Sequence, residues 1–205
     1  IEEPIAAAIG AGIDISRPCG NMIVDIGGGT ADIAVISLGG IANAQSIRVA
    51  GDAMNLAVQR YMRDVFRMDL GENTAENVKK ILGSAMPQAN APALEVSGKD
   101  LVQGTPRVVT VSEGHIREAL REPIQAILET VLRALEKTPP ELSADIYRNG
   151  MLMAGGGSLL KGLDQFIARE TRLKVFVDKE PLTTVLRGTA RAMLDRRAYH
   201  SVFIN

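Results

Sequence analysis

The first third of the chain carries short apolar runs separated by glycines. Met22–Ile26 and Asp32–Leu38 are two such runs, rich in β-branched residues, and Ala42–Val49 is a more dilute third run. Runs of this length that end at glycine turns predict three β-strands. From Gly51 to Phe66 the apolar residues instead recur every three or four positions, which predicts one long helix.

Patterns of the same kind predict the other elements. Helices are expected over Glu2–Ala11, Thr74–Leu82 (capped by Asn73 or Thr74), Ser112–Arg121, Pro123–Lys137, Glu141–Arg148, Leu159–Thr171 and Thr183–Arg197. Short strands are expected over Leu94–Val96, Val108–Val111, Met151–Ala154 and Lys174–Val177. Apart from residues 69–121, this order predicts an α/β fold, a mixed sheet covered by helices. Residues 69–121 are expected to form a small α+β lobe inserted into that fold.

The first glycine turn, Gly27–Thr30, lies between two predicted strands. Three glycines without Cβ atoms can present several backbone N–H groups to one anion. A helix would follow in a P-loop or a Rossmann turn, so the strand after Thr30 excludes both and favours a phosphate-binding hairpin. Asp25 precedes the turn in an apolar strand and needs a partner there, for which a water-held Mg²⁺ is suitable. A plain hairpin turn is the alternative.

The second glycine turn, Gly155–Ser158, lies between a predicted strand and a predicted helix. Glycines at a helix N-terminus leave N–H groups and the positive end of the helix dipole for an anion or a ribose oxygen. Lys161 falls at the wrong spacing for a Walker motif. A tight strand–helix turn is the alternative explanation.

Two charged groups have both an ordinary and a functional interpretation. Glu2 and Glu3 begin the first helix, where acids commonly complement the helix dipole; one of them could instead orient water as a general base. Glu76, Lys79 and Lys80 share one helix face. They could form a solvated ion pair, or they could contact the edge of a nucleoside.

Composition limits the function classes. The 205 residues carry a net charge of −1, with 46% hydrophobic and 23% charged residues, so nothing indicates nucleic-acid binding. Cys19 is the single cysteine, which excludes a disulfide framework and favours a reduced, cytoplasmic protein. No apolar stretch is as long as a membrane span. The sequence starts with Ile1 rather than Met, and we expect it to be part of a longer chain.

Several stretches resemble a known superfamily. Ile1–Gly10 and Asp25–Thr30 resemble the actin-like ATPases, which include actin, chaperone ATPases and sugar kinases. More specific similarity to the MreB family of bacterial actins extends over nearly the whole chain. It is carried by Ala34–Ile41, Gln45–Asp52, Ile116–Pro123, Leu135–Leu142, Gly155–Leu160 and Asp178–Thr189.

The resemblance implies an actin-like ATPase core, a ribonuclease-H-like βββαβαβα mixed sheet. Residues 21–68 and 122–182 would form this core and residues 69–121 the inserted lobe. Residues 1–20 would hold a connecting helix from an absent N-terminal half, and residues 183–205 a second connecting helix and a tail. The apolar faces of these two helices should be exposed or covered by a second copy, at Ile5, Ile9, Val185, Leu186 and Met193.

The resemblance also assigns roles to residues, with ATP and Mg²⁺ as cofactors. Gly27, Gly28, Gly29 and Thr30 would form a phosphate loop, and Asp25 would be its metal-linked acid. Gly155, Gly156 and Gly157 would form the adenosine loop, and Glu76, Lys79 and Lys80 would line the nucleoside. Glu3 would activate water, assisted by Thr30.

The implied function is that of an ATP-binding, filament-forming cytoskeletal protein that maintains rod shape by organising cell-wall synthesis. Its partners would be further copies of itself, cell-shape and wall-synthesis proteins and, through the absent half, the inner membrane surface. ATP hydrolysis is expected of the full-length protein, whereas this chain alone should bind ATP weakly and not hydrolyse it. A non-catalytic interaction module and a chaperone ATPase are the alternatives.

Overall fold

A five-stranded mixed sheet is the centre of the computed structural model, which describes residues 1–203. In the order β3-β2-β1-β7-β8, its strands are β3 (Gly40–Ile47), β2 (Ala31–Ser37), β1 (Asn21–Ile26), β7 (Met151–Ala154) and β8 (Val175–Val177). The first three strands pair antiparallel, and β7 and β8 continue parallel to β1. The predicted mixed sheet is therefore confirmed.

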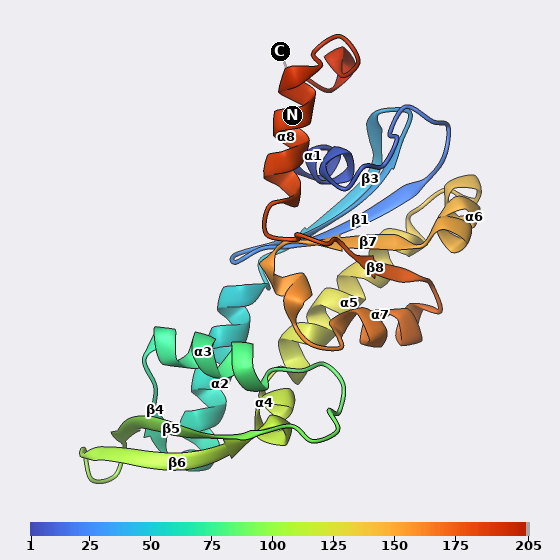
Figure 1. Ribbon diagram of the computed structural model, residues 1–205. Helices are drawn as coiled ribbons and strands as arrows, with labels where there is room; N and C mark the ends of the chain where they lie inside the picture. The colour runs from blue at the N-terminus through green and yellow to red at the C-terminus, as the bar shows by residue number, and fades with distance from the viewer. Residues whose placement is uncertain (204–205) are drawn as a thin grey trace.

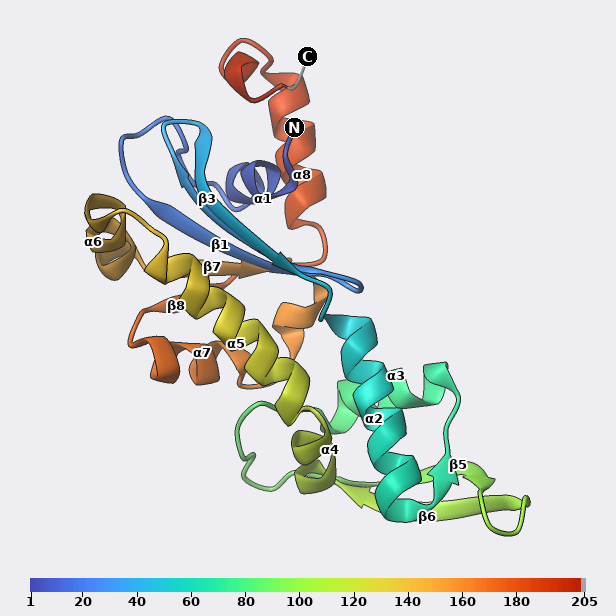
Figure 2. The ribbon, with the colours of Figure 1, turned by 180° about the vertical axis from the view of Figure 1, so that it is seen from behind.

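Helices cover both faces of this sheet, as the views from the two sides show (Figures 1 and 2). One face is covered by α1 (Glu3–Gly10), with α8 (Thr184–Leu194) across it. The other face is covered by α5 (Arg121–Glu136), α6 (Pro140–Asn149) and α7 (Leu163–Thr171). Burial on both faces explains why β1 and β2 are almost continuously apolar in sequence.

The helices α1 and α8 cross at two glycines. A Cβ atom on Gly10 would overlap the carbonyl oxygen of Thr184, and one on Gly188 would overlap that of Ala6. Arg191 of α8 also donates from Nη1 to the carbonyl oxygens of Ile9 (2.8 Å) and Gly10 (3.1 Å), which satisfies the C-terminus of α1. The two helices therefore form one closely packed pair.

This close packing corrects one expectation from the sequence. Ile5 and Ile9 were expected to be exposed or covered by a second copy, but they are 3% and 1% exposed because α8 and the sheet of the same chain cover α1. Val185 is partly buried in the same cluster. Leu186 and Met193, on the outer side of α8, are exposed as expected.

A second lobe extends from the end of the sheet (Figure 1). The helix α2 (Gly51–Phe66) leads into it and packs against α3 (Glu72–Leu82) and α4 (Glu113–Ala119). A three-stranded antiparallel sheet completes it, in the order β4 (Met68–Asp69), β5 (Ala93–Asp100) and β6 (Pro106–Ser112). The two longer strands extend well beyond the short ranges predicted from the sequence.

Several helix boundaries also differ from the predictions. Helix α3 begins at Glu72 after Gly71, so neither Asn73 nor Thr74 is its cap. Helix α5 begins at Arg121, which places Pro123 inside its first turn, where a missing N–H costs nothing. The helix expected from Leu159 is interrupted: η1 (Gly156–Leu159) is a 3₁₀ turn, and α7 starts after Gly162, whose φ is +70°. A last 3₁₀ turn, η2 (His200–Val202), follows α8.

Candidate functional site

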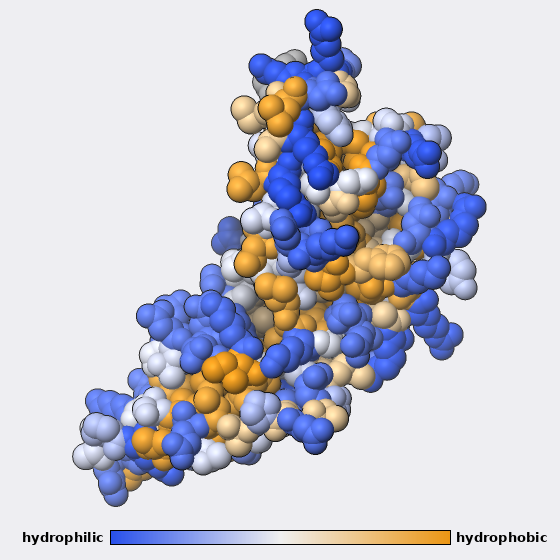
Figure 3. Space-filling view, in the orientation of Figure 1, coloured by the Kyte–Doolittle hydropathy of each residue, from blue (hydrophilic) through white to orange (hydrophobic). Residues whose placement is uncertain are grey.

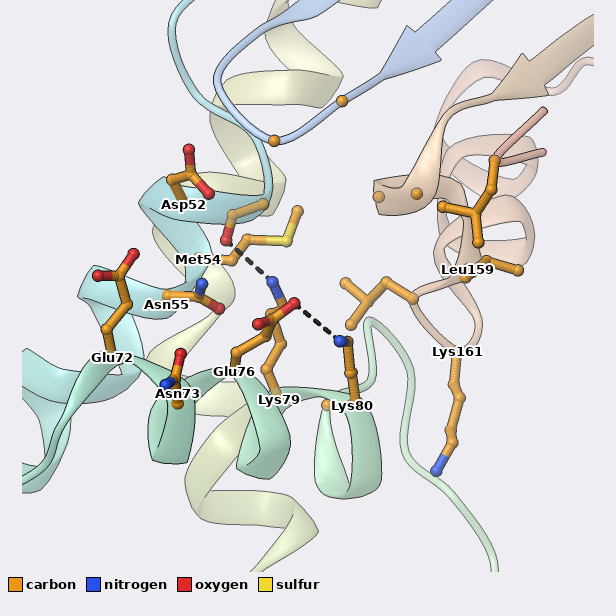
Figure 4. A pocket seen from close by; sticks show the side chains of 18 residues that line it. Asp52, Met54, Asn55, Glu72, Asn73, Glu76, Lys79, Lys80, Leu159 and Lys161 are labelled. Carbon is orange, nitrogen blue, oxygen red and sulfur yellow. Dashed lines mark hydrogen bonds and ion pairs between the residues drawn. The ribbon is translucent and has the colours of Figure 1, made fainter. Parts of the chain in front are cut away.

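A cavity of about 490 Å³ lies where the two lobes meet. Both glycine turns, the start of α2 and one face of α3 surround it (Figure 4). Its volume is within the range of small-molecule sites in proteins. Seven of the residues predicted from the sequence line it: Gly27, Gly28, Glu76, Lys79, Lys80, Gly156 and Gly157.

The first glycine turn is tied to the start of α2 through its carbonyl groups. The carbonyl oxygen of Gly27 accepts from the N–H of Gly51 (3.1 Å), and that of Gly28 accepts from the N–H of Asp52 (2.8 Å). The N–H of Gly27 closes the hairpin on the carbonyl oxygen of Thr30 (2.9 Å). Within residues 1–203, the N–H groups of Gly28 and Gly29 make no backbone hydrogen bond, so they remain available to an anion.

Neither backbone conformation nor packing requires glycine in this turn. None of the three glycines has a positive φ. A Cβ atom on Gly27 or Gly28 would lie 3.5 Å from its nearest neighbour, which is ordinary contact, and one on Gly29 would meet nothing within 4 Å. The missing side chains therefore leave space at the surface of the turn, and one part of that space belongs to the cavity.

The second glycine turn is different, because the fold itself requires two of its glycines. Gly155 has a φ of +77°, and a Cβ atom there would overlap the carbonyl oxygen of Ile26 and the carboxylate of Asp25. A Cβ atom on Gly157 would overlap the Ile26 side chain. A tight strand–turn connection is thus sufficient to explain these glycines, although Gly156 and Gly157 also line the cavity.

Three acids lie close together behind the first glycine turn, outside the cavity lining. Asp25 is 5% exposed and stands opposite Asp32 in the β1–β2 register. Burial, together with the nearby carboxylates of Glu3 and Asp32, raises the pKa of Asp25 to about 6. The structure thus brings Glu3 and Asp25 together, as predicted site residues, but outside the cavity lining. Three other predicted residues, Gly29, Thr30 and Gly155, lie outside the lining as well.

This acidic group fits a magnesium ion held mainly by other ligands. No cluster of three or more His, Cys, Asp or Glu within residues 1–203 has the geometry to hold a metal by itself. Mg²⁺ commonly keeps several waters and binds one or two carboxylates together with substrate phosphates. A single buried carboxylate beside a glycine turn matches that chemistry.

The helix α3 supplies the charged wall of the cavity. Lys80 Nζ pairs with Glu76 Oε1 at 2.8 Å, and Lys79 Nζ donates to the carbonyl oxygen of Gly51 at 3.0 Å. Burial lowers the pKa of Lys79, although the carboxylates of Glu76 and Asp52 oppose that shift. The Lys79 ammonium is therefore a partly desolvated cation held close to the first glycine turn.

The sequence did not indicate several other lining residues. Asp52, Asn55, Glu72 and Asn73 add polar groups on α2 and α3, and the opposite wall is apolar, formed by Leu159, Leu160 and Leu182. Asn55 is 5% exposed, and its Oδ1 has no hydrogen-bond partner among the described residues. No motif marks these positions, because they come together only when α3 folds across from the glycine turns.

A family model described as MreB/Mbl protein matches residues 1–201. The chain belongs to the MreB/Mbl family. It is 46% identical over 194 residues to the cell shape-determining protein Mbl of Bacillus subtilis, covering 95% of this chain and 58% of that protein. It is also 46% identical over 193 residues to the cell shape-determining protein MreB of Escherichia coli, covering 94% of this chain and 56% of that one. The chain thus spans little more than half the length of these MreB/Mbl relatives.

Solved structures agree with membership of the MreB/Mbl family. MreB5 of Spiroplasma citri bound to ADP superposes with a TM-score of 0.94 at 37% identity, over 98% of this chain and 61% of that one. The MamK double helical filament superposes with a TM-score of 0.77 at 23% identity, which shows the shared fold only. The actin-like fold and the resemblance read from the sequence are both confirmed. No helix in residues 1–203 combines the length and the hydropathy of a membrane span.

Proposed function

We propose that the cavity binds ATP with Mg²⁺, and that the chain is the nucleotide-binding part of a filament-forming, cell shape-determining actin homologue. The relatives named for cell shape belong to the same family, and one structural relative was solved with ADP. The observation that carries the proposal is the first glycine turn, whose three glycines serve neither conformation nor packing.

Each wall of the cavity suits one part of the nucleotide. The free N–H groups of the first glycine turn are donors for phosphate oxygens, and such charge-assisted hydrogen bonds contribute about 1.5–3 kcal/mol each. Lys79 adds a positive charge beside them. The apolar wall of Leu159, Leu160 and Leu182 suits the base, and the carboxylates and amides on α2 and α3 are acceptors for sugar hydroxyls.

We assign the remaining predicted residues to the metal and to water. Asp25 would hold Mg²⁺ through its waters; the metal supplies charge neutralisation for the phosphates. Glu3, close to Asp25 at the start of α1, would orient water in the full-length protein, with Thr30 assisting. For this chain alone, which spans little more than half the length of its relatives, ATP binding should be weak and hydrolysis negligible.

Self-association is the proposed basis of filament formation. The outer side of α8 exposes Leu186, Met193 and Leu194, each more than 60% exposed, and hydrophobic residues follow this edge in the space-filling view (Figure 3). An apolar surface of this kind is typical of an interaction site. Cell-shape proteins, wall-synthesis proteins and the inner membrane surface are the other proposed partners.

Turnover distinguishes this ATPase from a non-catalytic interaction module with an inherited nucleotide fold. ATP hydrolysis should be measured on the chain extended to the length of its relatives, with Glu3→Ala beside it and Glu2→Ala as the matched control. The proposal predicts hydrolysis that Glu3→Ala abolishes and Glu2→Ala retains. Filament formation without any nucleotide turnover or binding would favour the interaction module instead.

A further inference from the structure

The loop that joins β8 to α8, residues 178–183, forms part of the cavity wall. Its Leu182 lines the cavity, and a Cβ atom on Gly156 would stand 3.0 Å from Leu182 Cδ2. Its Pro181 accepts a hydrogen bond from the N–H of Gly155 at 3.0 Å. The β8–α8 loop therefore carries Leu182 into the cavity wall and is hydrogen-bonded to the second glycine turn.

One arginine of α8 fastens this loop at two points. Arg187 Nη1 donates to Glu180 Oε2 at 3.1 Å, and Arg187 Nη2 pairs with Asp178 Oδ2. Thr184 donates to the same Asp178 oxygen. The side chains of Arg187 and Asp178 are 28% and 10% exposed, so solvent screens this pair less than the other ion pairs among the described residues.

The contacts of the Arg187 guanidinium are not those expected of a residue that only stabilises the fold. Its Nε is buried and lacks a hydrogen-bond partner in residues 1–203. A buried donor left unsatisfied is unfavourable, and a shielded ion pair is weak evidence for stabilisation, because desolvation offsets much of the attraction. Arg187 does not line the cavity itself, so it could act on a ligand only through the loop it holds.

We propose that Arg187 is a positioning residue of the nucleotide cavity, which holds the β8–α8 loop so that Leu182 and the second glycine turn form the base-side wall. The inference rests on the proposed nucleotide function of this cavity. Arg187 leaves the phosphate side unaffected, because the first glycine turn is anchored separately, on Gly51 and Asp52 of α2. Its loss should therefore weaken binding of the nucleoside part of ATP and spare binding of the phosphates.

The test compares two probes, ATP·Mg²⁺ and inorganic tripolyphosphate with Mg²⁺, by NMR titration of the isotope-labelled chain. Amide signals of the first glycine turn report phosphate binding, and the Leu182 methyl signals report the base-side wall. The variants are Arg187→Ala, the conservative Arg187→Lys, and Glu180→Gln. Glu180→Gln removes the charge of the exposed partner of Arg187 and keeps the pair with Asp178. Arg191→Ala is the matched control, since it removes a guanidinium of the same helix that contacts α1 instead of the loop.

We expect Arg187→Ala to weaken ATP·Mg²⁺ binding by about tenfold, the scale on which outer-sphere partners act at other sites, with tripolyphosphate binding unchanged. Arg187→Lys should recover part of the loss, Glu180→Gln should show a smaller loss, and Arg191→Ala none. Equal ATP affinity in Arg187→Ala, or equal losses for both probes, would overturn the positioning role. Should Arg187→Ala not fold, Glu180→Gln with unaltered ATP affinity and Leu182 signals would overturn it. A wild-type chain that binds neither probe would instead refute the proposed function, and the inference with it.

Discussion

Replacing Gly28 by alanine separates ligand binding from folding. Gly28 lines the cavity, has no positive φ, and offers a Cβ atom ordinary contact 3.5 Å from Asp52 Oδ1. The new methyl group would occupy the space that the missing side chain leaves in the turn. If that space receives phosphate, the substitution blocks the ligand while the fold accepts it.

The two effects have opposite signs and separable sizes. A glycine-to-alanine change at a compatible conformation stabilises a protein by about 0.4–1 kcal/mol, because the unfolded chain loses freedom. For a chain of this length, that raises Tm by up to about 4 °C. Loss of even one charge-assisted hydrogen bond to phosphate costs about 1.5–3 kcal/mol, so ATP·Mg²⁺ should bind at least about tenfold more weakly.

Thermal unfolding followed by circular dichroism and titration with a fluorescent ATP analogue measure the two effects on the same sample. Gly114→Ala is the matched control: it lies in α4, where a Cβ atom would stand 3.9 Å from Ser112 Oγ, and it does not line the cavity. It should gain stability with unchanged binding. The reasoning is refuted if Gly28→Ala binds nucleotide as the wild type does, or if it lowers Tm.

Gly157→Ala should have the opposite profile: the overlap of its Cβ with Ile26 should cost about 1–3 kcal/mol of unfolding free energy, seen in urea titration. Asp25→Asn should stabilise the chain above pH 6, on the order of 2 kcal/mol. The folded protein holds the Asp25 proton up to about pH 6 and the unfolded chain only to 3.8, so wild-type stability falls as pH rises through this window. Leu186→Glu combined with Met193→Glu should shift the chain toward monomer in light scattering, because both apolar side chains are exposed.

Each of these three expectations has a contradicting result. A Gly157→Ala variant as stable as the wild type would show that the overlap relaxes without cost. If the unfolding free energy of Asp25→Asn changes between pH 4 and 6 as that of the wild type does, the titrating group is not Asp25. A wild-type chain already monomeric at high concentration would remove the case for self-association through α8.

Local sequence patterns were enough for the elements that contain their own signal. The range predicted for α2, Gly51–Phe66, and that for β7, Met151–Ala154, agree with the structure. The strand after the first glycine turn was also predicted, because β-branched residues follow Thr30 directly. β4 was missed, since its two residues, Met68 and Asp69, show no periodicity and form a strand only by pairing with Lys99 and Asp100.

Long-range packing explains what the sequence could not show. Burial of Ile5 and Ile9 depends on the Gly10–Gly188 crossing, whose partners are more than 170 positions apart. Leu159, Leu182 and Asn55 likewise enter the cavity from three separate segments. The difference between the two glycine turns was also invisible in the sequence: both read as triple glycines, yet only the second is required by its contacts with β1.

The central claim is that the cavity between the two glycine turns binds ATP·Mg²⁺, and an NMR titration of the isotope-labelled chain tests it most directly. The account predicts weak, saturable binding with a dissociation constant above the micromolar range. The largest amide shifts should be at Gly28, Lys79 and Gly157. Gly71, which lies outside the cavity, should not shift. Absence of any shift up to millimolar ATP·Mg²⁺, or shifts that leave out the first glycine turn, would contradict it.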